Sequence, residues 1–367
     1  MKKVVLAPDS FKGSLSSREV CDIVSSAILS NYPDAQIKCI PVADGGEGTA
    51  EAFIYSSGGE RVYCKVKSPL GRDVKAYYAM LADKTAVVEC ALASGLTVEQ
   101  EREPLLASSY GTGQLIRAAL DGGAERIFVG IGGSAMTDGG TGCLGALGAR
   151  FYDGEGRELY PCGKNLEAIR KIDISGLDKR ISEKPIIVLC DVKNPLYGKN
   201  GAAYIFAPQK GAEEKETELL DRGLENFAAV SAALLGKDYS FNEGAGAAGG
   251  LGFALVAFLG AELKSGIDIV LDYCGFEKAA EGADLIITGE GKLDSQSLMG
   301  KVPFGVASRA SGKRILALVG INEASADECA SMGISEVLQT NPMHLPFEEI
   351  KHRAKEMLYV AAEKIIL

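Results

Sequence analysis

Short apolar runs alternate with segments of helical periodicity near the start of the chain. Val4–Ala7 and Ile37–Val42 predict two strands. Between them, the apolar positions of SSREVCDIVSSAILSNY recur at helical spacing, with Ser16 or Ser17 as the N-cap. Thr49–Tyr55 predicts a second helix. This strand–helix–strand–helix order favours a parallel sheet with right-handed crossovers.

The pattern changes from about Arg61 onward. The stretch RVYCKVKSPLGRDVKAYYAML alternates apolar and polar residues around a Pro-Leu-Gly turn, which predicts a β-hairpin. TAVVECALASGL and GTGQLIRAALDGGAERIFVGIGG combine strands with helices, and KPIIVLCDVKNPLYG predicts a buried strand that ends at Asp191. Residues 213–235 predict an amphipathic helix, and GGLGFALVAFLGAEL a buried one. ADLIITGEGKLDSQS, KRILALVGI and ISEVLQT then restore the compact β-loop-α order.

A chain of 367 residues exceeds the size at which single cores stop growing, about 250–300 residues, so two domains are expected. The fold class is α/β with two α/β domains. Residues 1–62 and 280–367 are expected to form a discontinuous, doubly wound parallel-sheet domain of Rossmann or flavodoxin-like type. Residues 63–279 are expected to form an inserted mixed-sheet domain.

Five loops that follow predicted strands share a composition of glycine with acidic, hydroxyl or lysine residues. They are PDSFKGS, DGGEGT, GGSAMTDGG, DVKNP and GEGKLDSQS. In doubly wound sheets ligands bind outside the carboxyl ends of the strands. The repetition of this composition therefore predicts that the loops converge on one cleft.

The most glycine-rich of these stretches, FVGIGGSAMTDGGTG, matches neither common nucleotide fingerprint. It lacks the lysine of G-x-x-x-x-G-K-[ST], and it has no G-x-G-x-x-G at the required strand-to-helix position. Its backbone N–H groups and the following helix N-terminus favour an anion. A tight turn with Ser134 or Asp138 as a helix cap is the other interpretation, and both remain open here.

The charged residues narrow the chemistry. The two histidines lie near the C-terminus, away from the glycine loops, which argues against a Ser-His-Asp triad or a His-based metal site. The loops instead carry carboxylates and lysines: Asp9, Asp44, Asp138, Asp191, Glu290 and Asp294, with Lys12, Lys193, Lys292 and Lys301. Carboxylates that hold Mg²⁺ or accept a proton, together with cations for phosphate, suit phosphoryl transfer. Each carboxylate taken alone is also consistent with a cap or turn.

Charge and cysteine content limit the partners and the compartment. A net charge of -10 argues against nucleic acid and anionic membrane as partners, although a small anionic substrate remains compatible. Nine scattered cysteines without a C-x-x-C pair suit a reducing cytoplasm. The apolar run Val4–Ala7 is shorter than the ~7–15 residues of a signal peptide core. We therefore expect a cytoplasmic enzyme, with monomer and homodimer both left open.

Seven motifs carry a resemblance to a known family. They are APDSFKGSLS, PVADGGEGT, GTGQLI, GIGGSAMTDGG, CDVKNPLYGKNGAAYIFAPQKGA, GAGAAGGLG and ADLIITGEGKLDSQSLMGKVPFGVA. The chain resembles the type-1 glycerate kinase family from residue 7 to beyond residue 307. The resemblance implies ATP- and Mg²⁺-dependent phosphorylation of D-glycerate, generally to 2-phosphoglycerate, in a cleft between two α/β domains. Met136 departs from the polar residue more usual at that place, and no purpose is evident for it.

Candidate roles follow for the loop residues. Asp191 is a candidate for the catalytic base or a Mg²⁺ ligand, and Asp138 is its rival for the role of base. The expected substrate contacts are Asp9, Ser10, Lys12, Gly13, Ser134 and Thr137. The expected phosphate or nucleotide contacts are Gly45, Gly46, Glu47, Gly132, Gly133, Gly289, Gly291, Lys292, Ser295 and Lys301. Glu290 and Asp294 are candidates for Mg²⁺.

Two other functions remain as alternatives. A non-catalytic, two-lobed sensor of a sugar acid or nucleotide would need fewer carboxylates near its anion. A hydroxy-acid dehydrogenase would need the dinucleotide fingerprint and a histidine base, neither of which the loops supply.

Overall fold

The structure is a computed structural model that describes residues 2–294, 297, 301–310 and 312–367. The chain separates into two compact units. The first comprises Met1–Asp44, Glu51–Gly58 and Ser265–Leu367, and the second comprises Gly45–Ala50 and Gly59–Lys264. None of the helices in the described residues has the length and apolar character needed to cross a membrane.

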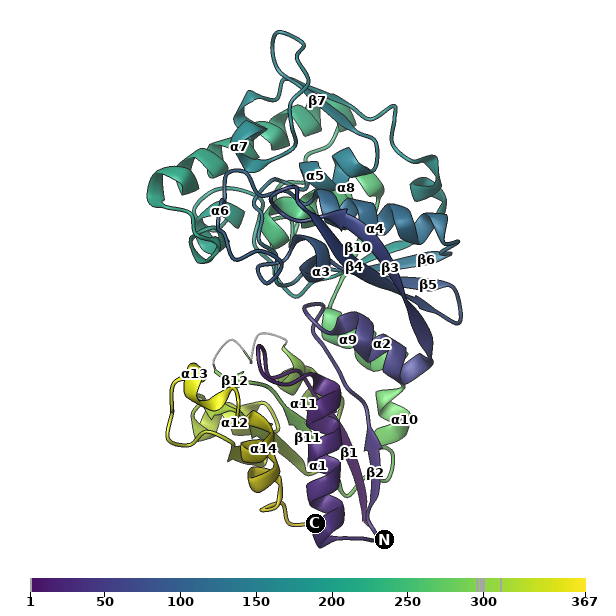
Figure 1. Ribbon diagram of the computed structural model, residues 1–367, viewed down its shortest axis with the longest axis vertical. Helices are drawn as coiled ribbons and strands as arrows, with labels where there is room; N and C mark the ends of the chain where they lie inside the picture. Colours follow the sequence, from purple (N-terminus) through teal and green to yellow (C-terminus); the bar gives the residue numbers. More distant parts are fainter. Residues whose placement is uncertain (1, 295–296, 298–300, 311) are drawn as a thin grey trace. The chain divides into compact units, whose positions relative to one another are not determined.

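A five-stranded parallel sheet forms the centre of the first unit (Figure 1). Its strands, in spatial order, are β15 (Glu336–Gln339), β13 (Ile315–Val319), β11 (Leu285–Gly289), β1 (Lys3–Pro8) and β2 (Gln36–Cys39). The chain runs from β1 outward to β2, and then builds the other half of the sheet from β11. The order therefore reverses between β1 and β11, and such a switch point opens a crevice at the carboxyl ends of the two strands.

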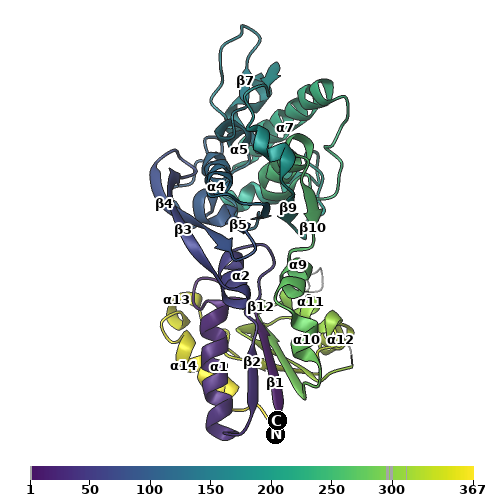
Figure 2. The same ribbon diagram turned by 90° about the vertical axis from the view of Figure 1, so that its right-hand side faces the viewer.

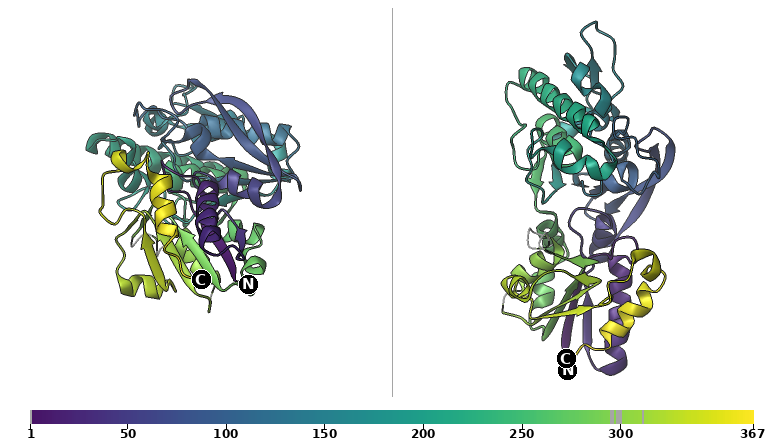
Figure 3. Two further views of the ribbon diagram at one scale, coloured as in Figure 1. Left: turned by 60° about the horizontal axis from the view of Figure 1, so that its bottom comes forward. Right: turned by 90° about the vertical axis from the view of Figure 1, so that its left-hand side faces the viewer.

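Helices pack against both faces of this sheet. Those that lie wholly in the first unit are α1 (Ser17–Asn31), α9 (Gly266–Tyr273), α10 (Phe276–Ala280), α11 (Val302–Arg309), α12 (Ala326–Ser331), α13 (Phe347–Ile350) and α14 (Ala354–Ala362). α1 and α14 lie side by side (Figures 1 and 3) and share one apolar core with alternate residues of β1 and β11. α11 packs against the same two strands. Two short strands, β12 (Lys292–Leu293) and β14 (Ile321–Asn322), pair beyond the sheet.

The second unit contains a six-stranded mixed sheet (Figure 2). In spatial order its strands are β10 (Glu262–Lys264), β9 (Ile186–Leu189), β6 (Arg126–Gly130), β5 (Thr85–Glu89), β4 (Asp73–Leu81) and β3 (Gly59–Lys67). β10, β9, β6 and β5 are parallel, whereas β4 and β3 form an antiparallel hairpin at the edge. The carboxyl ends of β5, β6 and β9 are therefore neighbours.

Short and long helices complete the second unit. They are α3 (Cys90–Ser94), α4 (Tyr110–Asp121), α5 (Thr141–Ala146), α6 (Ala202–Phe206), α7 (Glu214–Leu235) and α8 (Leu251–Leu259), with the 3₁₀ helices η1 (Gly163–Ala168), η2 (Lys179–Glu183), η3 (Pro208–Lys210) and η4 (Ala247–Gly250). A small antiparallel pair is formed by β7 (Arg150–Tyr152) and β8 (Lys171–Asp173). α2 (Thr49–Ser57) begins in residues of the second unit and continues in the first.

The predicted α/β fold, with a doubly wound parallel sheet and a mixed sheet, is confirmed. Ser16 is the N-cap of α1, in a capping box with Glu19, because its hydroxyl accepts from the Glu19 N–H and the Glu19 carboxylate accepts from the Ser16 N–H. The hairpin and the buried helix α8 are also present. Two strand ends differ from the prediction. β2 stops at Cys39 rather than Val42, and β9 stops at Leu189, so Asp191 lies in the following loop rather than at the strand terminus.

Candidate active site

The five glycine loops fall into two groups, one at the carboxyl edge of each sheet. In the first unit, residues 9–13 follow β1 and residues 290–294 follow β11, at the switch point of the sheet. The Asp9 N–H donates to the Gly289 carbonyl at 2.8 Å, which joins the two loops. The other three loops belong to the second unit, including residues 45–50, which the sequence assigned to the first domain.

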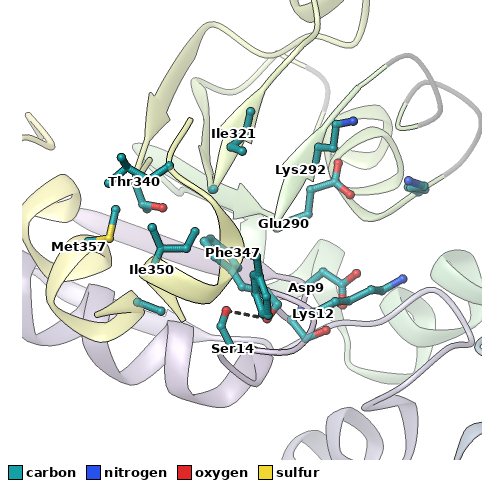
Figure 4. Close-up of a pocket in the computed structure, with 17 residues that line it drawn as sticks. Asp9, Lys12, Ser14, Glu290, Lys292, Ile321, Thr340, Phe347, Ile350 and Met357 are labelled. Carbon is teal, nitrogen blue, oxygen red and sulfur yellow. Dashed lines mark hydrogen bonds between the residues drawn. The ribbon is translucent and has the colours of Figure 1, made fainter. Parts of the chain in front are cut away.

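The two loops of the first unit border a cavity of about 310 Å³. Its charged side chains are Asp9, Lys12, Glu290, Lys292 and Lys301. Figure 4 shows Asp9, Lys12, Glu290 and Lys292 gathered at one end of the cavity. Such a mixture of carboxylates and lysines can hold a polyanion together with a divalent cation.

Burial makes the two carboxylates of this cavity difficult to ionise. Asp9 is 5% exposed, and its burial, together with the nearby charge of Asp44, raises its pKa well above the usual range. Lys12 and the Ser10 N–H, which donates to Asp9 at 2.6 Å, act in the opposite direction. Burial likewise raises the pKa of Glu290 to about 7. A bound cation would favour the ionised form of both groups.

Lys292 and Lys301, at the cavity, lie near carboxylates. Lys292 Nζ lies 2.8 Å from Glu323 and 3.8 Å from Asp294, and Lys301 Nζ lies 3.9 Å from Asp294. These pairs are partly exposed, so they fix side-chain positions more than they stabilise the fold. Ser295, predicted as a phosphate contact, lies outside the described residues.

In the second unit the loops DGGEGT and GGSAMTDGG pack backbone against backbone. The Gly132 N–H donates to the Gly45 carbonyl at 3.1 Å. A Cβ at Gly132 would lie 2.7 Å from the Gly46 Cα, and one at Gly45 would lie 2.7 Å from the Leu189 carbonyl oxygen. These glycines are needed because two loops and a strand end meet without room for a side chain.

Glu89 holds the first of these loops, and sequence reasoning missed it. This residue ends β5, is 1% exposed, and accepts from the N–H groups of Gly48 at 3.2 Å and Ala50 at 2.6 Å. The carboxylate therefore satisfies donors in the first turn of α2, where the helix dipole also favours negative charge. The sequence signal that could have identified Glu89 is its place as the charged residue at the end of the apolar run TAVVE.

Asp138 lies completely buried at the centre of the GGSAMTDGG loop. One carboxylate oxygen, Oδ1, accepts from the Gly140 N–H at 3.0 Å. The other, Oδ2, accepts from the Ser109 N–H, the Ser109 hydroxyl and the Gly142 N–H at 2.7, 2.8 and 3.1 Å. Burial raises the pKa of Asp138, and these hydrogen bonds lower it. Four donors directed at two oxygens suit a carboxylate that organises the loop.

Lys210, which the sequence analysis did not select, supports the same loop. This residue ends η3, is 2% exposed, and donates from Nζ to the Met136 carbonyl at 2.6 Å. Burial lowers the pKa of Lys210 to about 8, and electrostatic interactions with Cys90 and Asp138 partly oppose this. Met136 thus has a structural purpose, because its side chain is buried in the core and its carbonyl receives a buried ammonium group.

The remaining predicted residues of this unit lie close to the same strand ends. Ser134 is 7% exposed and pairs with Gly95 in an isolated bridge. Thr137 is buried, and its Oγ1 has no hydrogen-bond partner among the described residues. Asp191 is half-buried in the loop after β9, beside β6 in the sheet. Its strand position places it at the same sheet edge as residues 131–140.

Metal-binding geometry is limited in the described part of the chain. No group of three or more His, Cys, Asp or Glu side chains there could hold a metal ion. Mg²⁺, however, is commonly bound through one or two carboxylates, with substrate phosphates and water supplying the other ligands. The buried carboxylates of Asp9 and Glu290 could supply the one or two protein ligands that such a site needs.

Comparison with known proteins decides the family. The sequence profile of the Glycerate kinase family matches residues 4–367. The chain belongs to this family. It is 48% identical to the "Glycerate 2-kinase" of Escherichia coli K12 across 89% of this chain and 86% of that protein. It is 43% identical to the "Glycerate kinase" of Bacillus subtilis 168 across 99% of this chain and 96% of that protein.

A solved structure agrees with this membership. The crystal structure assigned as glycerate kinase 2 of Salmonella typhimurium LT2 superposes with a TM-score of 0.85 at 44% identity, covering 99% of this chain and 96% of that one. The resemblance found in the seven sequence motifs is confirmed. The protein is a kinase, and therefore a transferase, of the glycerate kinase family.

Proposed function

We propose that this protein transfers the γ-phosphoryl group of ATP to D-glycerate in the cytoplasm, with Mg²⁺, and forms 2-phosphoglycerate. The observation that carries the proposal is the 48% identity to the Escherichia coli "Glycerate 2-kinase" over most of both chains. The name of that relative supports the position of the new phosphate ester. The charged loops at both sheet edges support the chemistry.

Phosphoryl transfer needs positioning and charge stabilisation more than covalent catalysis. Lys12, Lys292 and Lys301 line one cavity of the first unit and suit phosphate oxygens. Asp9 and Glu290, with Asp294 close to Lys301, are the carboxylates suited to Mg²⁺. Bound Mg²⁺ would neutralise charge on the phosphate oxygens and leave these lysines to orient them.

The acceptor needs an anion site and a base. The amide of Gly133 and the hydroxyls of Ser134 and Thr137 are proposed to bind glycerate, because the Gly132 N–H already donates to the Gly45 carbonyl. The unpartnered, buried Thr137 hydroxyl supports this assignment among the described residues. Asp191 is proposed as the base that accepts the proton of the attacking hydroxyl, because Asp138 already accepts four hydrogen bonds within its own loop.

Assays of Asp191→Asn and Asp138→Asn test the base assignment. A general base contributes about 10²–10⁴-fold, so Asp191→Asn should lower kcat by that factor with little change in KM. Asp138→Asn should lower the free energy of unfolding because it disturbs the loop. A near wild-type kcat in Asp191→Asn would show that Asp191 is not the catalytic base.

ADP release in the presence of D-glycerate and Mg²⁺ tests the function itself, and NMR spectra of the product distinguish 2- from 3-phosphoglycerate. Omission of Mg²⁺ is the matched control. If D-glycerate and ATP raise the melting temperature without any turnover, the protein is a sensor instead.

A further inference from the structure

The cavity of the first unit has an apolar end that the phosphoryl chemistry does not use. The large apolar side chains that line the cavity are Phe11, Ile321, Leu345, Phe347, Ile350 and Met357. In Figure 4, Ile350 and Met357 lie on the side away from Asp9 and Lys12, and Phe347 lies between the two ends. Thr340 adds a polar side chain beside the apolar wall.

Glycerate does not match this wall. Each of its three carbons carries oxygen, so it has no apolar surface to bury against aromatic and aliphatic side chains. A volume of about 310 Å³ is at the lower end of the range for small-molecule sites, ~300–1,000 Å³, and exceeds what a three-carbon acid needs. The site instead suits a ligand with a flat, weakly polar end and a polyanionic end.

The apolar wall is held in place by the backbone around it. Asn341 is completely buried, and its amide exchanges two hydrogen bonds of 3.0 Å with the backbone of Leu345. The Asn341 N–H also donates to the Gly320 carbonyl at 2.9 Å. The segment that carries Leu345 is thus anchored to the end of β13. A preformed wall lowers the ordering cost of binding.

The charged end and the apolar wall meet at the loop after β1. A Cβ at Gly13 would lie 3.0 Å from Cζ of Phe347, so the ring packs on the loop backbone. Ser10 lines the cavity, and its buried hydroxyl has no hydrogen-bond partner within the described ranges. An available donor at a sheet switch point indicates a ligand site.

We propose that this cavity binds the nucleotide donor, with the purine base against the wall formed by Phe11, Phe347 and Met357 and the phosphates toward Lys12 and Lys301. The inference rests on the proposed function and assigns the donor to the first unit. Lys12 and Ser10, expected from the sequence to bind glycerate, then contact the donor phosphates.

Hydrogen–deuterium exchange of the wild-type protein locates the site without any variant. The probe is ADP with Mg²⁺, in the absence of glycerate. Slower exchange is expected in residues 341–357, which carry the apolar wall. Slower exchange confined to residues 131–142, with none in 341–357, would overturn the proposal.

Two variants give an independent measurement. Phe347→Ala removes part of the wall, and Ala354→Phe fills the cavity from α14. Loss of base–aromatic stacking typically weakens binding by about tenfold or more, so the Kd of a fluorescent N-methylanthraniloyl-ADP should rise by that factor in Phe347→Ala. The same Kd should rise in Ala354→Phe because the added ring occupies the space proposed for the base. Val360→Ala, an exposed change in α14 outside the cavity, is the matched control and should leave Kd unchanged.

Steady-state kinetics separate this inference from the function it rests on. Phe347→Ala should raise the KM for ATP while the KM for D-glycerate stays within twofold. Suppose that the wild type turns over, and that neither variant changes the KM for ATP or the Kd of the fluorescent nucleotide. That result would refute nucleotide binding in this cavity and leave the kinase function intact. Absence of wild-type turnover would refute the function, while the exchange experiment would still decide whether the cavity binds ADP.

Discussion

The buried ammonium of Lys210 predicts an unusual dependence of stability on alkaline pH. Its side chain is 2% exposed and donates to a main-chain carbonyl at 2.6 Å. Burial lowers its pKa from the ordinary 10.5 to about 8. This difference corresponds to about 3 kcal/mol, at about 1.4 kcal/mol per pH unit. The native state is therefore destabilised by this amount when Lys210 is charged, relative to a native state in which Lys210 is neutral.

The sign of the effect follows from where each state releases its proton. Below pH 8, Lys210 is charged in both states, and the cost lowers the free energy of unfolding in full. Between pH 8 and 10.5 the native state has lost the proton while the unfolded state retains it, so the free energy of unfolding rises with pH. Above pH 10.5 the cost is absent. Cys90 and Asp138, which interact electrostatically with Lys210, are the same in the wild type and in the variant used to test this effect.

Urea unfolding of the wild type and Lys210→Met, from pH 7.5 to 10.5 in reducing buffer, isolates this contribution. The difference in free energy of unfolding, wild type minus variant, should grow by about 3 kcal/mol over that window. Lys215→Met removes an exposed ammonium from α7 and should show no such trend. A wild-type-minus-Lys210→Met difference that stays constant from pH 8 to 10.5 would refute the reasoning.

Three further predictions concern residues of the second unit. Ser109→Ala removes a hydroxyl donor to a buried carboxylate and should lower the free energy of unfolding by about 1–3 kcal/mol in urea; a loss under 0.5 kcal/mol contradicts this. Gly250→Ala places a Cβ 2.7 Å from a backbone Cα at φ +94°, and calorimetry should show at least about 2 kcal/mol more destabilisation than in Gly198→Ala, whose φ is +88° in open space. Equal losses would exclude the close contact as the cause. Glu89→Gln turns one acceptor into a donor, so the amide of Ala50 should exchange with deuterium faster; unchanged exchange would mean that this carboxylate does not hold the turn.

Local pattern was sufficient for the longer helices and strands and for much of the loop composition. The capping box at Ser16, the edge hairpin and the buried helix α8 follow from spacing within a few residues of each other. The strand-end loops were identifiable because glycine with Asp, Ser or Lys recurs after apolar runs. Glycine-rich motifs that extend over nearly the whole chain also identified the family.

The grouping of the loops could not be predicted from that pattern. Strand order assigns two loops to the edge of one sheet and three to the edge of the other, a division of which composition gave no sign. Residues 45–50 belong with the second sheet because Gly45 contacts the ends of β6 and β9. Such contacts depend on which strands become neighbours, and that is decided by pairing across long sequence separations.

The sequence alone therefore determined the main helices and strands, the α/β class and the family, because these depend on periodicity, capping and contiguous motifs. Only the tertiary structure showed that hydrogen-bond donors surround Asp138 and that Lys210 donates to the carbonyl of Met136, 74 residues away. It also showed that the Phe347 ring packs against Gly13. Burial and hydrogen bonding between distant segments set the charge and exposure of a side chain. Charge and exposure distinguish a residue that organises a loop from one that can bind a ligand. Neither property can be predicted from the local sequence pattern.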